Sequence, residues 1–88
     1  MKIKECYDTE GWYDRYTIVF KDSRPNPDPN NPHRRLYMCL GMNDTPENPS
    51  FGISQFGECI LGKHLGKKIA FNDLPDNIQI HVNRRMLE

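Results

Sequence analysis

Residues 64–88 of this 88-residue chain, HLGKKIAFNDLPDNIQIHVNRRMLE, contain the signals that decide its fold. Pro75 suits the first turn of a helix, where its missing N–H group has no partner inside the helix. Asp73 is expected to cap the free amides of that turn, and Asp76 adds negative charge near the positive end of the helix dipole. Arg84 and Arg85 fall in the last turn, where cations are favoured. One face repeats at helical spacing and carries Leu74, Ile78, His81, Val82 and Met86.

The same stretch leaves a strand open as an alternative. Residues 78–82, IQIHV, alternate apolar and polar side chains and contain three β-branched residues, a pattern typical of a half-buried strand. Residues 75–77 would then form a turn. The proline, the carboxylates beside it and the basic end favour the helix, so residues 76–83 are predicted to be helical, with the strand as the second possibility.

Two strands are expected in the first quarter of the chain. Residues 2–8 form the first, and the following DTEG at 8–11 has Asp and Gly where a type I turn prefers them. Residues 12–21 form the second, and the two strands make a hairpin. The face of the second strand that is expected to point inward carries Trp12, Asp14, Tyr16, Ile18 and Phe20.

Residues 36–42 are expected to form a third strand, which is apolar on both faces and therefore central or covered. Residues 51–57, FGISQFG, are irregular and predict a buried-edge loop or a very short strand. Residues 69–71 form a short apolar run that is typical of a buried strand end. One face of the third strand carries Leu36, Met38, Leu40 and Met42.

Residues 22–35, DSRPNPDPNNPHRR, differ in composition from their surroundings. Four prolines remove amide donors and bias their predecessors to extended conformations, and no apolar side chain anchors the segment. We expect a proline-rich, mobile loop between the second and third strands. A binding role is the less favoured interpretation, raised because long loops in compact domains are often functional.

These elements predict an α+β fold: a small antiparallel sheet of three to four strands, largely a meander, with one C-terminal helix packed on it. The length predicts a single domain over residues 1–88. A small all-β barrel is the alternative if residues 76–83 form a strand.

Composition limits the classes of function. The 12 basic and 12 acidic residues cancel, which argues against bulk attraction to nucleic acid or anionic membrane. No apolar run is long enough to span a bilayer and no signal-peptide core follows the first residues, so a cytoplasmic location is expected. The cysteines, Cys6, Cys39 and Cys59, are odd in number and widely spaced, and each is expected to be a buried small hydrophobe.

Motifs for catalysis or metal binding are weak. The histidines and cysteines form no CxxC or HxxxH pair of the kind used by structural zinc sites. Residues 57–64, GECILGKH, match GxxxxGK, but His64 stands where a Ser or Thr would hold magnesium. No cysteine is marked as an activated thiol, and no second acid in a predicted cleft accompanies Asp73 and Asp76. The sequence therefore predicts a non-enzymatic protein without a cofactor or metal.

Basic side chains remain as the candidate partner-binding residues. With exposed Tyr13, Tyr37 or Phe51 nearby, they would provide a surface on which single-stranded nucleic acid stacks. A solvated, charged face on a neutral protein is the favoured interpretation, because nucleic-acid-binding domains usually show a clear basic excess. Near Lys63 and His64, the candidates are Lys67, Lys68, Arg84 and Arg85, joined by Arg34 and Arg35.

Three segments, DRYTIVF at 14–20, FGISQFGE at 51–58 and HLGKKIAFNDLPDNIQIHV at 64–82, resemble short phage, plasmid and bacterial accessory proteins of unknown function. In these a DRYTVVF strand, a GFSQ turn and an LGK-I-F-DLP--VQ-H tail recur. The resemblance implies a mobile-element setting and a helical tail, and it assigns no site residue. We therefore expect a small binding module that acts by protein–protein contact, for example on a host or defence protein, with nucleic-acid binding through a local basic patch as the alternative.

Overall fold

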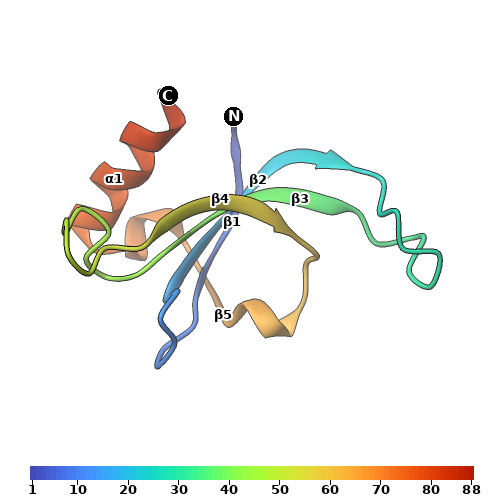
Figure 1. Cartoon of the computed structure of the whole chain (residues 1–88), viewed down its shortest axis with the longest axis horizontal. Helices are drawn as coiled ribbons and strands as arrows, with labels where there is room; N and C mark the ends of the chain where they lie inside the picture. Colours follow the sequence, from blue (N-terminus) through green and yellow to red (C-terminus); the bar gives the residue numbers. More distant parts are fainter.

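The computed structural model describes all 88 residues as one five-stranded antiparallel sheet with one α-helix packed against it (Figure 1). The helical segments are the 3-10 turns η1 (Lys63–Leu65) and η2 (Phe71–Asp73) and the helix α1 (Asp76–Met86). The predicted α+β class is confirmed, although the sheet has five strands where three or four were expected. The strands are β1 (Ile3–Asp8), β2 (Tyr16–Arg24), β3 (Leu36–Met42), β4 (Ser54–Cys59) and β5 (Lys67–Ile69).

The strand order is β4-β3-β2-β1-β5, so the first four strands form the expected meander and β5 joins its far edge. β5 pairs with β1 in antiparallel register, with Cys6 opposite Ile69 and Asp8 opposite Lys67. The chain between β4 and β5 crosses the face of the sheet opposite α1, where Leu65 packs on Tyr7 and Val19. The strand end predicted at residues 69–71 is found only at Ile69, where β5 ends, and a strand of three residues gives almost no alternation that would reveal where it starts.

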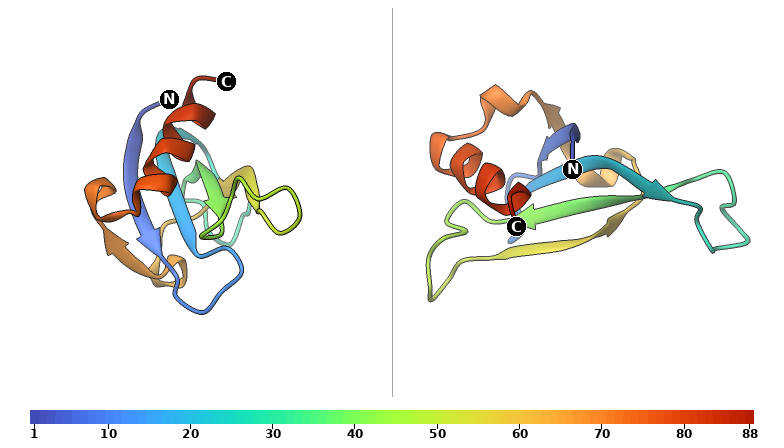
Figure 2. Two further views of the ribbon diagram at one scale, coloured as in Figure 1. Left: turned by 90° about the vertical axis from the view of Figure 1, so that its left-hand side faces the viewer. Right: turned by 90° about the horizontal axis from the view of Figure 1, so that it is seen from above.

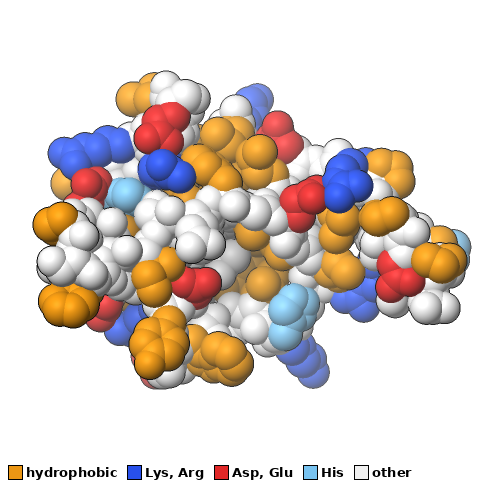
Figure 3. Space-filling model, in the orientation of Figure 1, with side chains coloured by type: hydrophobic (Ala, Val, Ile, Leu, Met, Phe, Trp, Pro, Cys, Tyr) orange, Lys and Arg blue, Asp and Glu red, His pale blue; other side chains and the backbone are white.

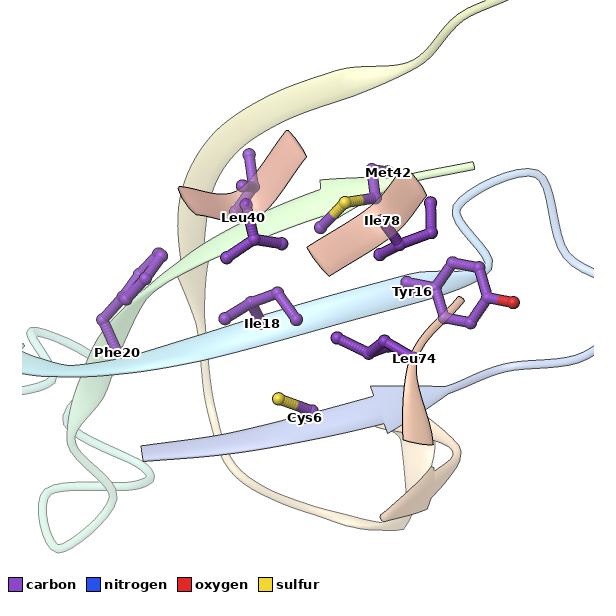
Figure 4. Packing of buried hydrophobic residues seen from close by; sticks show 9 residues of the cluster. Cys6, Tyr16, Ile18, Phe20, Leu40, Met42, Leu74 and Ile78 are labelled. Carbon is purple, nitrogen blue, oxygen red and sulfur yellow. The ribbon is translucent and has the colours of Figure 1, made fainter. Parts of the chain in front are cut away.

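The main core lies between α1 and the sheet (Figure 4). Ile78 and Val82 of α1 are fully buried against the central strands β2 and β3. Residues 76–86 are helical, so the strand alternative for this segment is wrong and the preferred helix is confirmed. No helix in the structure has both the length and the apolar character needed to cross a membrane. From the sheet, the core takes Cys6, Tyr16, Ile18, Phe20, Leu40 and Met42.

The start of α1 differs from the prediction. Asp73 was expected to cap α1, but its carboxylate accepts a hydrogen bond from the Ala70 amide at 3.2 Å and so closes the preceding turn η2. Pro75 is the N-cap of α1, and its carbonyl accepts bonds from the amides of Ile78 and Gln79, each at 3.0 Å. Phe71 belongs to η2 instead of ending a strand, and it is only partly buried.

The second strand begins later than predicted. β2 starts at Tyr16, and Trp12, expected to point inward, is 72% exposed in the turn before it. The turn closes at its base, where the Thr9 amide bonds to the Arg15 carbonyl at 2.7 Å. Gly11, with a φ of 85°, adopts the left-handed conformation that bends the chain there. Alternation continued across this turn in the sequence, so the pattern alone placed the strand start too early.

The same strand ends later than predicted, because β2 continues to Arg24 and leaves 25–35 as the loop. Val19 faces Cys39 and Ser23 faces Tyr37, so two extra residues bulge from β2 between these pairs. Beyond the bulge the two strands and the loop form an arm, residues 21–37, that projects from the sheet away from α1 (Figure 1). The mobility of its proline-rich tip stays a prediction.

The predicted inner face of the third strand is confirmed only in part. Leu40 and Met42 are fully buried, whereas Met38 is exposed and Leu36 is half-buried. The difference arises because α1 covers the sheet at one end and does not reach the arm (Figure 1). For residues 51–57 the buried-edge loop is wrong, and the alternative of a very short strand is nearer, because the segment leads into β4, an exposed strand of six residues.

The core makes one prediction about stability. Ile78→Ala should lower the free energy of unfolding by about 2–5 kcal/mol, because it leaves a cavity between α1 and the central strands. Ile80→Ala on the exposed side of the same helix is the matched control and should change it by about 0.5 kcal/mol or less. Urea unfolding measures both values, and equal values would show that α1 does not pack as described.

Candidate functional site

β4 is an open edge of the sheet. It pairs only with β3, and no element lies along its outer side (Figure 2). The Asn43 amide bonds to the Ile53 carbonyl at 3.2 Å, which fixes the alternation of hydrogen-bonding groups along the pair. It follows that the backbone N–H and C=O groups of Ser54, Phe56 and Glu58 point away from β3. They are free to pair with another strand.

The two edges of the sheet are protected to different degrees. Natural sheets blunt their edges by shortening them or by placing lysine or proline there, because free edges associate. β5 is only three residues long and includes Lys67 and Lys68. β4 has six residues with no lysine or proline, and its one charged side chain, Glu58, is held by two hydrogen bonds from Arg24 at 2.6 and 2.8 Å. The β4 edge therefore lacks the usual protection.

Exposed aromatic side chains lie at the end of the sheet where β4 begins. The β1–β2 turn and the β3–β4 loop meet this end, because Tyr16, Met42 and Ser54 are in register. Trp12 is 72% exposed, and Phe51 is 77% exposed. Aromatic residues are enriched at protein interfaces, so their exposure at this end of the sheet favours a contact surface there.

A groove lies at the other end of β4 and is the largest concavity of the protein, with a volume of about 650 Å³. In the space-filling view a hollow with hydrophobic side chains at its floor opens on this face (Figure 3). A second hollow of about 300 Å³ adjoins it, and both are lined by Arg34 and Ile60. The larger hollow, called the β4 groove below, is also lined by Leu36, Glu58, Cys59 and His64.

The structure divides the predicted basic residues among three places. Lys67 and Lys68 lie on β5, where Lys68 pairs with Glu5 at 3.3 Å. The C-terminal end of α1 lies over β4, because the Arg85 guanidinium stacks on Phe56 at 4.6 Å. Three strands separate β4 from β5, a distance of about 19 Å at ordinary strand spacing. The β5 lysines and the α1 arginines therefore do not form one patch.

Arg34 and Arg35 form the third group, in the arm, where its loop meets the start of β3. Arg34 lines both hollows and donates a hydrogen bond to the Leu61 carbonyl, while Arg35 donates to the Ser23 hydroxyl at 2.8 Å. Neither has a carboxylate within ion-pair distance. Each of the other four arginines does: Arg15 with Asp8, Arg24 with Glu58, Arg84 with Glu47 and Arg85 with Glu88.

His81 joins α1 to the β3–β4 loop through a chain of hydrogen bonds. Its Nδ1 lies 2.8 Å from the Glu47 carboxylate, and its Nε2 lies 2.7 Å from the Ser54 hydroxyl. Because a carboxylate only accepts, Nδ1 is the donor of the first bond. Arg84 also donates to Glu47, at 3.1 Å. The hydrogen bond from His81 is the main cause of a lowered pKa of Glu47, and the bond from Arg84 adds to it.

The order serine, histidine, carboxylate is that of a nucleophile, its base and an orienting acid. Catalysis of acyl transfer also needs free N–H donors beside the serine and a cavity for the substrate. The nearby loop amides of Ser50, Phe51 and Ile53 are bonded to asparagine side chains, and neither hollow reaches Ser54. The chain of bonds is best described as a latch that fastens the loop to the helix.

The prediction for the cysteines is confirmed for one of three. Cys6 is buried in the main core, and burial raises its pKa to about 11. Cys39 and Cys59 are partly exposed and point to the same face of neighbouring strands. Their thiols interact, which lowers the pKa of Cys39 and raises that of Cys59. Cys59 in the β4 groove is therefore held as a neutral thiol, which makes it a poor nucleophile.

Comparison with family models, with curated proteins and with solved structures found no match to this chain. The resemblance to mobile-element proteins therefore stays a prediction.

Sequence reasoning missed both the open edge and the groove. Residues 54–59 contain one glycine and little alternation, so no strand of that length was expected, and its edge position follows only from the strand order. The groove brings Arg34 next to His64, 30 positions away in the sequence. A partial signal existed in the arginine pair that ends the proline-rich loop, because no acidic residue lies within five positions of it.

The latch makes a prediction about pH. The charged form of Glu47 is favoured in the folded protein, because its pKa there is lower than the ordinary 4.5 of glutamate. The charged carboxylate therefore stabilises the fold fully above pH 4.5, and this stabilisation is lost as the pH falls through the lower pKa of the folded state. Glu47→Gln should lower the melting temperature at neutral pH, and the difference from the parent protein should shrink on acidification. Thermal unfolding from pH 7 to pH 3 measures this.

Ser54→Ala is the matched control, because it removes a hydrogen bond of His81 without removing a carboxylate. Between pH 5 and pH 3 its difference from the parent protein should stay nearly constant. A Glu47→Gln difference that does not change with pH would contradict the latch.

Proposed function

We propose that this protein is a non-enzymatic binding module that takes an extended segment of a partner protein as an additional strand along β4. The open β4 edge is the observation that carries this proposal. Its outward backbone groups at Ser54, Phe56 and Glu58 supply donors and acceptors in the spacing that a strand requires. Addition of a strand to a free sheet edge is a common mode of peptide recognition.

Side-chain contacts on both faces of the edge support this mode. An added strand alternates its side chains between the two faces of the sheet. On the α1 face it meets Phe56, which packs against Phe20 with ring centroids 6.3 Å apart. On the other face it meets Cys59 and the β4 groove. Such a segment finds apolar contacts at alternate positions, which give it specificity beyond the main-chain bonds.

The size of the edge predicts modest affinity. Each main-chain hydrogen bond contributes about 1 kcal/mol net, and fixing an extended peptide costs conformational entropy. Binding in the micromolar range is therefore expected, as for small and transient interfaces. Micromolar affinity suits a regulatory or accessory role on a host or defence protein. The setting we propose is a mobile element or another accessory system in the cytoplasm.

Nucleic-acid binding is the alternative function, and the geometry supports it less. The β5 lysines and the α1 arginines lie at opposite edges of the sheet, and all but Lys67 are ion-paired. Oligonucleotide binding measured at low salt tests this alternative. We expect that changing Lys67 and Lys68 to glutamate does not weaken any binding of oligonucleotides. Binding that weakens as the salt concentration rises and that is lost in this variant would favour nucleic acid as the ligand.

Strand addition is tested with random peptides displayed on phage and selected against the whole protein. Enriched peptides are synthesised and their dissociation constants measured by fluorescence polarisation. Glu58→Pro should abolish their binding, because proline removes an outward N–H donor from an edge where it breaks no bond to β3. Glu58→Ala is the matched control: it loses the same side chain and frees Arg24 in the same way but keeps the donor, so it should still bind the peptides.

Two outcomes would contradict the proposal. One is peptide binding that Glu58→Pro leaves intact in a folded variant. The other is a dimer in sedimentation experiments that Glu58→Pro dissociates, since the edge would then pair with a second copy of the chain. A melting curve for each variant shows that it folds.

A further inference from the structure

The unpaired arginines place positive charge beside the β4 groove, where the loop of the arm meets β3. Four of the six arginines have a carboxylate partner, and the two that lack one, Arg34 and Arg35, are neighbours beside the β4 groove. Arg34 uses one nitrogen to bond the Leu61 carbonyl. A guanidinium has five N–H donors, so the rest are available to a ligand.

The surroundings of Arg34 leave the positive charge uncompensated. His64 lines the β4 groove with it, and His33 and Arg35 line the adjoining hollow. The one acidic residue in the groove is Glu58, and Arg24 neutralises it through two hydrogen bonds. Arg34 and Arg35 are therefore a local excess of positive charge in a protein whose 12 basic and 12 acidic residues cancel.

The groove also has an apolar floor. Leu36, Ile60 and Leu65 line it, and Cys59 contributes a neutral thiol. Beside such a floor, water competes less for a carboxylate that is bound to Arg34, and the attraction between the two charges is screened less than on an open surface. The lining therefore suits a ligand that combines an apolar side chain with a carboxylate.

The position of the groove connects it to the open edge. Glu58 and Cys59 are the last residues of β4 and also line the groove. A strand that pairs with β4 and continues past Glu58 would enter the groove, placing one side chain on the floor. A neighbouring side chain would then reach Arg34, since alternate residues of a strand lie about 7 Å apart.

We infer that the β4 groove is a subsite for an acidic residue of the added strand, an Asp or Glu within two positions of an apolar residue, with Arg34 as its bidentate partner. This inference rests on the proposed strand addition. It names the partner segment by its chemistry: an extended peptide that is apolar along β4 and acidic where it passes the arm.

The test uses the peptides selected on the whole protein and their affinities. Enriched peptides should share an acidic residue at a fixed distance from an apolar one. Arg34→Gln should weaken the best peptide about tenfold or more, the loss expected for one charge-assisted bidentate pair. Changing the peptide acid to its amide should weaken it by a similar factor, and the two changes together should cost little more than either alone.

Lys67→Gln on the far edge is the matched control, because it removes one exposed positive charge outside the groove. It should leave affinity unchanged, while Arg34→Lys should retain only part of it because lysine lacks the planar fork. Melting curves check that each variant folds.

Failure of the subsite is distinguishable from failure of strand addition. Peptides that need the Glu58 amide but carry no shared acid, and that bind Arg34→Gln as tightly as the parent, would overturn the subsite and leave strand addition intact. If no peptide is enriched, both proposals fall together. Binding of oligonucleotides that is lost in Arg34→Gln would assign the groove to a different class of ligand.

Discussion

The burial of Ile78 and Val82 against the two central strands is the contact on which the rest of the structure depends. Both side chains are fully buried, and they cover the only part of the sheet where β2 and β3 carry a continuous apolar face. An isolated helix of 11 residues is marginal in water, so α1 is stabilised mainly by this packing. The sheet in turn needs the helix, because its other face is covered only by a small cluster around Leu65.

The two ends of the sheet consequently serve different purposes. At the α1 end, the helix, the η2 turn and the latch of Glu47, His81 and Ser54 hold loops in place. At the arm end, the apolar face stops and charged residues take over. The open strand β4 runs from one end to the other, so a segment bound along it would have one terminus at the α1 end and the other at the charged groove. Orientation of the partner along β4 would be set by this difference.

Local signals in the sequence were sufficient for the helix and the central strands, and insufficient for the edges. Proline at the start, apolar spacing through Ile78 and Val82 and a basic end identified α1 correctly. The alternation of apolar and polar residues located β1 and β3 to within a residue but placed the start of β2 at Trp12. The error arose because the residues of the preceding turn continue the alternating pattern of the strand. Strand order and pairing of distant residues, which create the open edge and the β4 groove, depend on long-range contacts that no local pattern contains.

The bulge in β2 has a dynamic consequence. By inserting two residues between the pairs Val19–Cys39 and Ser23–Tyr37, it interrupts the hydrogen-bond ladder between the core and the arm. We therefore expect the amides of the arm to exchange with solvent deuterium faster than those of the strands beneath α1. Opening of the arm would break the bonds from Arg24 to Glu58 and from Arg34 to the Leu61 carbonyl, and would so change the shape of the β4 groove.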